Sequence, residues 1–146
     1  LKRYYGMSEE QFRLFFKRAE RQKGITGENL LSMLERRLDN VVFLMGFSKS
    51  RSHARQLIAH GHFQINDHKV NVPSYVVSEG DIVLFKERSA KSGEIQSVVE
   101  ANKNKNVPGW LEVDWDNFKG RVLSLPKRAD VTIHVEEHLI VELYSK

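Results

Sequence analysis

The spacing of apolar residues changes at Gly61, and this change constrains the fold of the 146-residue chain more than any other sequence feature. Before Gly61, apolar residues recur every three or four positions, which is the period of an amphipathic helix. After it, short β-prone segments are separated by turn signals such as Asn66-Asp67 and Glu79-Gly80-Asp81. Helices that come first and strands that follow predict an α+β fold, with helices packed on a small, mostly antiparallel sheet.

Three helices are expected before Gly61. Ser8, followed three residues later by a glutamine, has the order of a capping box and predicts a helix from about Glu9 to Arg21. A second helical repeat runs from Glu28 to Met45, and the glycine after it suits a left-handed C-terminal cap. A third helix is expected from Ser50 to His60, with the serine as its N-cap.

The segments after Gly61 alternate between strand-like and helical patterns. Asn66-Asp67 is a turn-forming pair between two β-prone runs, so a hairpin is expected there. The closing run is apolar and β-prone, and it is expected to dock on the fold rather than fray. The expected segments are hairpin strands His62–Ile65 and His68–Val72, a buried strand Ile82–Phe85, a helix Ser92–Asn102, strands Trp110–Asp114 and Arg121–Leu125, and the closing run Leu139–Tyr144.

Positive charge is concentrated in the first half of the chain. The net charge is +4, but residues 1–69 hold 13 Lys and Arg against 7 Asp and Glu, whereas residues 70–146 hold 10 against 12. No acidic residue lies between Asp39 and Asp67. A basic half on a globular chain favours a polyanionic partner such as nucleic acid, because Lys and Arg that neutralise phosphates release counterions. A solvated basic face that keeps the protein soluble is the alternative.

Several classes of function lack their sequence signals. The chain has no cysteine, which excludes disulfides, thiolate zinc sites and cysteine nucleophiles within it. It shows no apolar run long enough to span a bilayer and no secretory signal, so a soluble intracellular protein is expected. No phosphate-binding glycine loop, nucleophile elbow or dinucleotide fingerprint is present, so we predict no catalytic residue and no cofactor. The histidines near position 60 lack accompanying cysteines or paired carboxylates, and no metal site is predicted.

The third expected helix carries the sharpest candidate for binding chemistry. Arg51 and Arg55 are one helical turn apart and project together. Ser50 places a hydroxyl and free backbone N–H groups at the helix N-terminus, where the partial positive charge favours phosphate. Gln56 adds an amide that both donates and accepts hydrogen bonds. An ordinary amphipathic helix with a hydrated basic face is the alternative.

The residues around this helix carry a family resemblance. The helix is followed by Gly61, the Asn66-Asp67 turn, Lys69-Val70-Asn71, Pro73 and Glu79-Gly80-Asp81. This succession, over residues 34–85, resembles the RNA-binding module named after the fourth protein of the small ribosomal subunit, a unit of two helices and a β-hairpin. Residues 34–41, 72–75 and 139–146, with the Tyr4-Tyr5-Gly6 opening, extend the likeness to the bacterial-type small-ribosomal-subunit protein four family. Members usually carry a further basic N-terminal segment, sometimes with zinc-binding cysteines, which this sequence does not show.

The resemblance implies an organisation and a function. It implies a helical subdomain at residues 1–47, against which residues 126–146 could pack, and an RNA-binding module at 34–85 extended by strands and a helix to about 125. It implies a structural, non-enzymatic component of the small ribosomal subunit that binds small-subunit rRNA directly, nucleates assembly and influences translational accuracy. Implied partners are rRNA, neighbouring small-subunit proteins and, as in some relatives, the protein's own messenger RNA, with no membrane. The implied location is the cytoplasmic ribosome, with an organellar ribosome left open.

The resemblance also implies which residues contact RNA. These residues would clamp phosphates and 2′-hydroxyls and recognise RNA shape more than base sequence. Tyr4 and Tyr5 could stack on bases or pack in the core, and one of the two arginines at 36 and 37 could instead pair with Glu35 or Asp39. The candidates are Lys49, Ser50, Arg51, Arg55, Gln56 and His60 on or beside the third helix, Lys69 on the hairpin, Lys2, Arg3, Tyr4, Tyr5, Arg13, Lys17, Arg21 and Lys23 in the helical opening, and Arg36 and Arg37, whose side chains are expected to reach outward.

Three other functions remain alternatives at this point. The same module occurs in RNA-modifying enzymes, but that reading needs a catalytic domain, and the residues outside the module carry no recognisable active-site motif. An RNA-binding translational repressor would use the same surface on a messenger RNA. A DNA-binding regulator would place the helix of residues 50–60 in a major groove, and it predicts sequence-specific binding to duplex DNA rather than to folded RNA.

Overall fold

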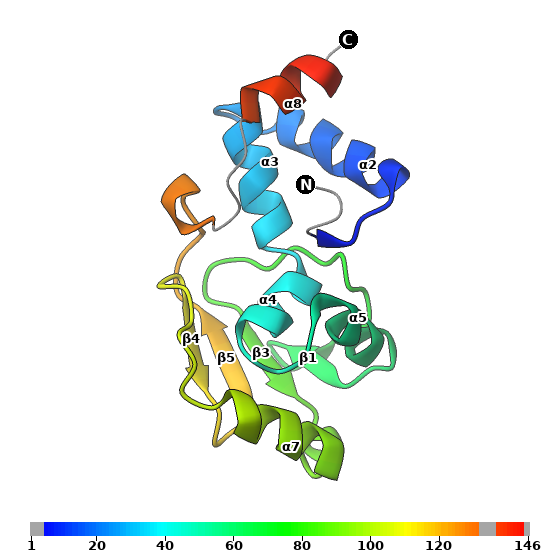
Figure 1. The fold of residues 1–146 in the computed structure, drawn as a ribbon, viewed down its shortest axis with the longest axis vertical. Coiled ribbons are helices and arrows are strands. Elements are labelled where there is room, and N and C mark those ends of the chain that lie inside the picture. Colours follow the sequence, from blue (N-terminus) through cyan, green and yellow to red (C-terminus); the bar gives the residue numbers. More distant parts are fainter. Residues whose placement is uncertain (1–4, 132–136, 145–146) are drawn as a thin grey trace.

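A computed structural model of the protein describes residues 5–131 and 137–144 (Figure 1). Helices precede most of the strands, and the α+β class is confirmed. The helices of the described part are α2 (Glu9–Arg21), α3 (Thr26–Glu35), α4 (Leu38–Leu44), α5 (Arg51–Ala59), α6 (Glu87–Ala90), α7 (Gly93–Asn102) and α8 (Glu137–Tyr144), with a 3-10 turn η1 (Arg128–Asp130). The strands are β1 (Phe63–Ile65), β2 (His68–Lys69), β3 (Ile82–Phe85), β4 (Leu111–Asp114) and β5 (Lys119–Val122).

The elements form two groups along the long axis of the molecule. Helices α2, α3 and α8 lie at one end and make the helical part, whereas the sheet and α7 lie at the other end, with α4 and α5 between them (Figure 1). Each group has its own apolar core. The core of the helical part contains Tyr5, Phe12, Phe16, Leu30 and Leu34. We call α4 to α7 with the five strands the sheet part; its core contains Leu38, Val41, Phe47, Ile58, Phe63, Phe85 and Trp110.

The sheet is antiparallel throughout, in the order β2-β1-β3-β5-β4. Asn66 and Asp67 have positive φ angles of 50° and 71°, the backbone of the tight turn that suits a two-residue hairpin. The predicted hairpin is therefore confirmed, although its second strand is limited to two residues. The register places Phe63 opposite Phe85, and this pairing brings the end of β3 beside the start of β1.

The prediction of one helix over residues 28–45 is wrong, because the chain breaks into α3 and α4 at Arg36 and Arg37. Arg37 forms an antiparallel bridge with Val76. The backbone N–H of Leu38 donates to the carbonyl of Tyr75 at 2.7 Å, and that of Val77 donates to the carbonyl of Arg36 at 3.0 Å. These long-range hydrogen bonds replace the helical ones at the break, so tertiary pairing overrides local helix propensity.

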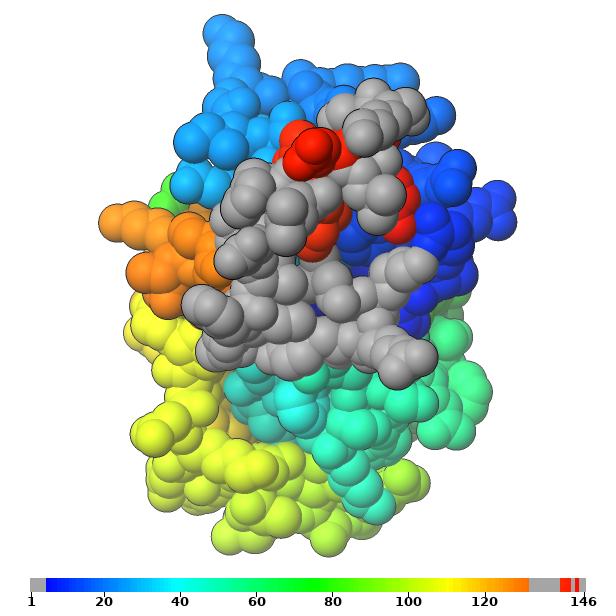
Figure 2. All heavy atoms as spheres, turned by 45° about the horizontal axis from the view of Figure 1, so that its top comes forward, coloured from blue at the N-terminus to red at the C-terminus, as the bar shows by residue number. Residues whose placement is uncertain are grey.

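The closing run is a helix, which corrects the expectation from its β-prone residues. Ile140 and Val141 each lie about one turn before Tyr144 on α8, and all three pack against the core of the helical part. The ring of Tyr144 lies 5.1 Å from that of Phe12. Figure 2 shows atoms of α8 (red) against the blue atoms of the helical part. A helical stripe that fits this apolar surface outweighs the β-propensity of single residues, since most helix stability in proteins comes from packing.

The remaining predicted elements are close to those observed. Helix α7 begins at Gly93, one residue after its predicted start at Ser92, and buries Ile95, Val98 and Val99. Strand β4 matches its prediction within one residue, whereas β5 is shifted toward the N-terminus and ends at Val122. Within residues 5–131 and 137–144, no helix is both long enough and apolar enough to cross a membrane.

Candidate nucleic-acid interface

Helix α5 is held in place by its caps and its buried face. The Ser50 hydroxyl accepts a hydrogen bond from the backbone N–H of His53 at 3.0 Å, so the predicted N-cap is confirmed. Ala54, Leu57 and Ile58 are buried in the core of the sheet part. Gly61 follows the helix with φ +82°, a left-handed conformation that glycine adopts without strain. The side chains of Lys49 and Gln56 and the ring of His60 remain exposed.

Arg51 points back toward α4 and the N-terminal segment. Its Nε donates a hydrogen bond to Oδ1 of Asn40 at 2.8 Å. The guanidinium carbon lies 4.7 Å from the centre of the Phe43 ring and 5.8 Å from that of Tyr5, within the range of cation–π contacts. Arg51 therefore joins α5 to α4 and to Tyr5.

Arg55 lies beside Arg51, as predicted from their spacing, and shares its internal orientation. Its guanidinium lies 3.6 Å from a carboxylate oxygen of Asp39 and donates to the backbone carbonyl of Tyr5 at 3.4 Å. A Cβ placed on Gly6 would lie 2.6 Å from the same guanidinium, so another residue at position 6 would shift the Arg55 side chain. The Arg55 side chain keeps 31% of its surface exposed, so part of its guanidinium faces solvent.

Arg37 does not reach outward. It is 1% exposed, and its guanidinium donates to both carboxylate oxygens of Asp39, at 3.2 and 3.0 Å. The structural ion pair named as an alternative is therefore confirmed, and the expectation of an outward Arg37 side chain is wrong. Arg36 is half-buried and donates to the carbonyl of Val77 at 2.9 Å. Burial, followed by the charge of Arg18, lowers the pKa of Arg36.

Tyr5 is a core residue and has no face free for a base. It is 1% exposed, and its hydroxyl donates to Oε2 of Glu35 at 2.6 Å. Burial raises the pKa of Glu35, and the hydrogen bond from Tyr5 opposes that rise. Asn40 adds a hydrogen bond of 2.7 Å to the backbone carbonyl of Glu35. The four residues Tyr5, Glu35, Asn40 and Arg51 thus form a chain of contacts from the N-terminal segment to α5.

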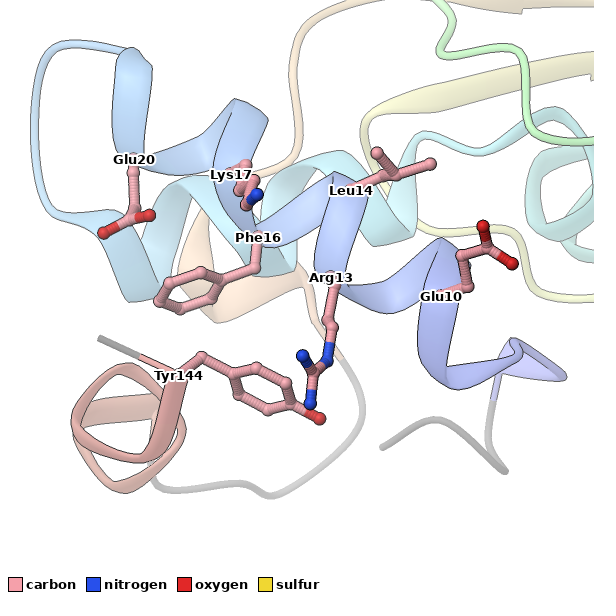
Figure 3. Close-up of a pocket in the computed structure, with 7 residues that line it drawn as sticks. All are labelled: Glu10, Arg13, Leu14, Phe16, Lys17, Glu20 and Tyr144. Carbon is pink, nitrogen blue, oxygen red and sulfur yellow. The ribbon is translucent and has the colours of Figure 1, made fainter. Parts of the chain in front are cut away.

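Two grooves flank α2, and they differ in charge. The groove between α2 and α8 holds both signs of charge, since Glu10 and Glu20 lie on the same wall as Arg13 and Lys17 (Figure 3). In this groove, Arg13 Nε and the Tyr144 hydroxyl both donate to Oε1 of Glu9, at 3.3 and 3.0 Å. The charge of Arg13 is therefore compensated locally, and this groove is a poor match for a polyanion.

In the groove on the other side of α2, the charged side chains contributed by the described residues are all basic. The charged residues that line it are Lys17, Arg18 and Arg21, and Ser74 lines its opposite wall. Arg18 lies 5.3 Å from the centre of the Phe15 ring, which holds its guanidinium at the groove. Lys17, Arg21 and also Lys23, in the loop before α3, are exposed as predicted.

A second positive cluster lies where α5 passes into β1. Lys69 from β2 and Lys86, the residue after β3, both extend over Gly61. A Cβ placed on Gly61 would lie 3.3 Å from Nζ of Lys69 and 3.9 Å from Nζ of Lys86. The rings of His60 and His62 lie 6.5 Å apart beside them. We call Lys69, Lys86, His60 and His62 the Gly61 cluster.

Comparison with known proteins identifies the family. A model of the S4 domain matches residues 36–83, and a model described as the ribosomal protein S4/S9 N-terminal domain matches residues 1–35. Over all 146 residues the chain is 54% identical to small ribosomal subunit protein uS4 of Thermoanaerobacter sp. (strain X514), of which it covers 70%. The chain belongs to the uS4 family. It is also 52% and 51% identical to the uS4 proteins of Desulforapulum autotrophicum and Pelobacter propionicus, again over its whole length and 70% of theirs.

The uS4 family models divide the chain at a structural boundary. The N-terminal match ends at residue 35 and the S4 domain match begins at residue 36, where α3 ends and the bridge to Val76 begins. The matched S4 domain holds α4, α5, β1, β2 and the first half of β3. The Gly61 cluster lies in this domain except for Lys86, which follows its last matched residue by three positions.

The structure brings together some of the predicted uS4 contact residues and separates others. Lys49, Gln56, His60 and Lys69 are exposed around α5 and the hairpin, whereas Tyr5 and Arg37 are buried. Lys2, Arg3 and Tyr4 lie outside the described residues. No group of three or more metal-binding side chains occurs within the part of the chain that the structure describes.

Sequence reasoning missed three residues of the positive surfaces. Arg18 lies three positions after Phe15, and the helical stripe alone gives it no special place. Lys86 and His62 become neighbours through the pairing of Phe63 with Phe85, and the backbone N–H of Lys86 donates to the carbonyl of His62 at 2.9 Å. The register of the strands brings Lys86 and His62 together, and no sequence pattern near either residue gives that register.

Proposed function

We propose that the protein is a structural component of the small ribosomal subunit that binds small-subunit rRNA directly. The observation that carries this proposal is the identity of 50 to 54% to uS4 proteins along the whole chain. This identity extends over both regions that match family models, residues 1–35 and 36–83. The names of those relatives place them in the small ribosomal subunit. On this basis the protein works within the ribosome of the cytoplasm, beside neighbouring small-subunit proteins.

The exposed cations supply the chemistry of such an interface. Lys17, Arg18 and Arg21 line one groove, and the Gly61 cluster forms a second positive area at the C-terminal end of α5. Lysine and arginine side chains at these places can neutralise backbone phosphates, which every RNA carries whatever its base sequence. The deep, narrow major groove of A-form RNA does not admit side chains, so recognition rests on phosphates, 2′-hydroxyls and shape.

Arg51 and Arg55 have a different role in this proposal. Their contacts with Asn40, Asp39 and Tyr5 hold the helical part against α5. They are positioning residues that fix the angle between the two positive areas, and the exposed edge of Arg55 is the part that can meet a phosphate.

The first test compares binding to small-subunit rRNA fragments with binding to duplex DNA of matched length over a salt series. A preference for folded RNA and a steep fall in affinity with salt are the expected results. Equal affinity for the two nucleic acids would contradict the proposal and favour non-specific polyanion binding. Sequence-specific duplex binding would favour the DNA-binding alternative.

The finer roles implied by the family resemblance belong to the same proposal. Nucleation of subunit assembly predicts binding to naked rRNA before other small-subunit proteins are added. An influence on translational accuracy predicts altered misreading in cells that carry interface variants. Repression of its own messenger RNA predicts that a transcript of its operon competes with rRNA for the same surface, and failure to compete would exclude that role.

A further inference from the structure

The lysines of the Gly61 cluster hold two positive charges over one backbone position. Gly61 has no side chain, and Lys69 and Lys86 reach over it from two different strands, with Nζ atoms 3.3 and 3.9 Å from where a Cβ would be. The two ammonium groups are therefore close enough for one phosphate group to contact both. Gly61 has a φ of +82°, which glycine adopts without strain, and a Cβ at this position would crowd the Lys69 side chain.

The charges of this cluster are not balanced within the described part of the chain. No ion pair with an acidic residue is present for Lys69 or Lys86 among residues 5–131 and 137–144. Burial and then the neighbouring Lys69 ammonium lower the pKa of Lys86. Like charges held close together oppose each other in the free protein, and a bound anion removes that cost.

The two histidines complete the surroundings of the lysines. Burial lowers the pKa of His62, and the charges of His60 and Lys86 lower it further. Nδ1 of His62 lies 2.7 Å from the hydroxyl of Ser89, which fixes the ring. The acidic residue that acts on His62 is Glu94, and its carboxylate lies 3.6 Å from Nε2 of His53. The cluster therefore presents polar groups and net positive charge.

We propose that Lys69 and Lys86 together bind one backbone phosphate of the RNA partner, with His60 beside it. This inference rests on the proposed function and makes it specific. It assigns a phosphate contact to Lys86, outside the matched S4 domain, and to the Gly61 end of α5 rather than to the arginines near its N-terminus. Those arginines already have internal partners, whereas neither lysine forms an ion pair with an acidic residue among residues 5–131 and 137–144.

The test is a double variant, Lys69→Gln with Lys86→Gln, compared with the wild type on the same small-subunit rRNA fragment over a salt series. Loss of one phosphate contact should make the slope of log affinity against log salt shallower by about 1 and weaken binding at low salt on the order of tenfold. The control is Lys105→Gln with Lys127→Gln, which removes the same charge from two exposed lysines elsewhere and should leave the slope close to wild type. Circular dichroism and thermal unfolding establish that all variants are folded.

Backbone amide shifts of Gly61 and His62 locate the site independently of affinity. RNA should shift these amides in the wild type but not in the Lys69/Lys86 double variant. Shifts caused by millimolar inorganic phosphate but not by the RNA fragment would overturn the assignment to RNA. If the wild type binds rRNA and the double variant keeps its slope and its shifts, the inference is wrong while the proposed function stands. If the wild type shows no preference for rRNA, the proposed function itself fails.

Discussion

The guanidinium of Arg51 donates a hydrogen bond of 2.8 Å to the side chain of Asn40, which precedes it by 11 residues. Asn40 in turn donates to the backbone carbonyl of Glu35 at the end of α3. Arg51, which the sequence predicts as a phosphate contact, therefore links α5 to the helical part through Asn40. Its substitution should affect the fold as well as any binding, and the two effects have to be measured separately.

Replacing Arg51 with Ala should lower the free energy of unfolding by about 1–3 kcal/mol, because a half-buried charged hydrogen bond and two cation–π contacts are lost. Denaturant unfolding measures this change. Lys49→Ala, an exposed neighbour, is the control and should stay within about 0.5 kcal/mol of wild type. If the Arg51 variant were as stable as wild type but bound RNA much more weakly, Arg51 would be a direct phosphate contact.

Replacing Tyr5 with Phe should destabilise the protein by about 1–3 kcal/mol, since a buried carboxylate loses its hydroxyl donor. Thermal and denaturant unfolding check this prediction. Tyr75→Phe removes a hydroxyl from a side chain that is 37% exposed and serves as the matched control. If Tyr5→Phe kept full stability but lost RNA affinity, Tyr5 would be a base-stacking residue after all.

The stability of the protein should depend on pH through Glu35. Burial raises the pKa of this carboxyl above its ordinary value of 4.5. The folded state therefore binds the proton more tightly, so this contribution is fully present below about pH 4.5 and is lost as pH rises through the raised folded pKa. Gln cannot ionise, and the stability of Glu35→Gln relative to wild type should rise across that window and then level off. Unfolding at a series of pH values tests this, with exposed Glu100→Gln as control; a difference that does not vary with pH would refute it.

Replacing Gly46 with Ala should cost about 1 kcal/mol or more, because Gly46 has φ +81° and a Cβ there would lie 2.9 Å from Cβ of Asn102. Asn102 also donates to the Gly46 carbonyl at 2.9 Å, so the substitution would push α7 away from the end of α4. Gly109→Ala is the control, since a Cβ at Gly109 would meet no atom within 4 Å. Equal melting temperatures for the two variants would contradict the prediction.

Replacing Arg18 and Arg21 with Gln should weaken rRNA binding and make its salt dependence shallower, by about 1 in the slope for each phosphate contact removed. The reason is that both arginines line the groove of α2 whose described charged residues are all basic. Arg13→Gln, on the same helix but paired with Glu9, is the control and should change the slope less. A larger effect at Arg13 would move the interface to the opposite groove.

Local signals in the sequence predicted most elements correctly. The caps at Ser8 and Ser50 and the Asn66-Asp67 turn act within a few residues, so their hydrogen bonds and backbone angles follow from neighbouring side chains. The break at Arg36-Arg37 could not be predicted in this way. It depends on pairing with residues about 40 positions later, which no local pattern contains.

The candidate site was predictable in its location but not in its individual contacts. The excess of positive charge predicted that the site lies in the first half of the chain. Lys17, Arg21 and Lys69, which are exposed there, agree with that prediction. Helical spacing correctly put Arg51 and Arg55 side by side, yet it cannot say which side of α5 meets Asp39 and Asn40. Lys86 joins the Gly61 cluster only through the strand register, which requires the fold to be known.

The bridge between Arg37 and Val76 has a consequence for the order in which the protein folds. The corner between α3 and α4 is stabilised by a segment that follows the hairpin, and Arg36 reaches Val77 across 41 positions of chain. Closing a loop of that length carries an entropy cost that the hairpin and α5 reduce when they form first. We therefore expect the corner to form late, so that the two ends of the molecule acquire their mutual orientation only after the middle of the chain is complete.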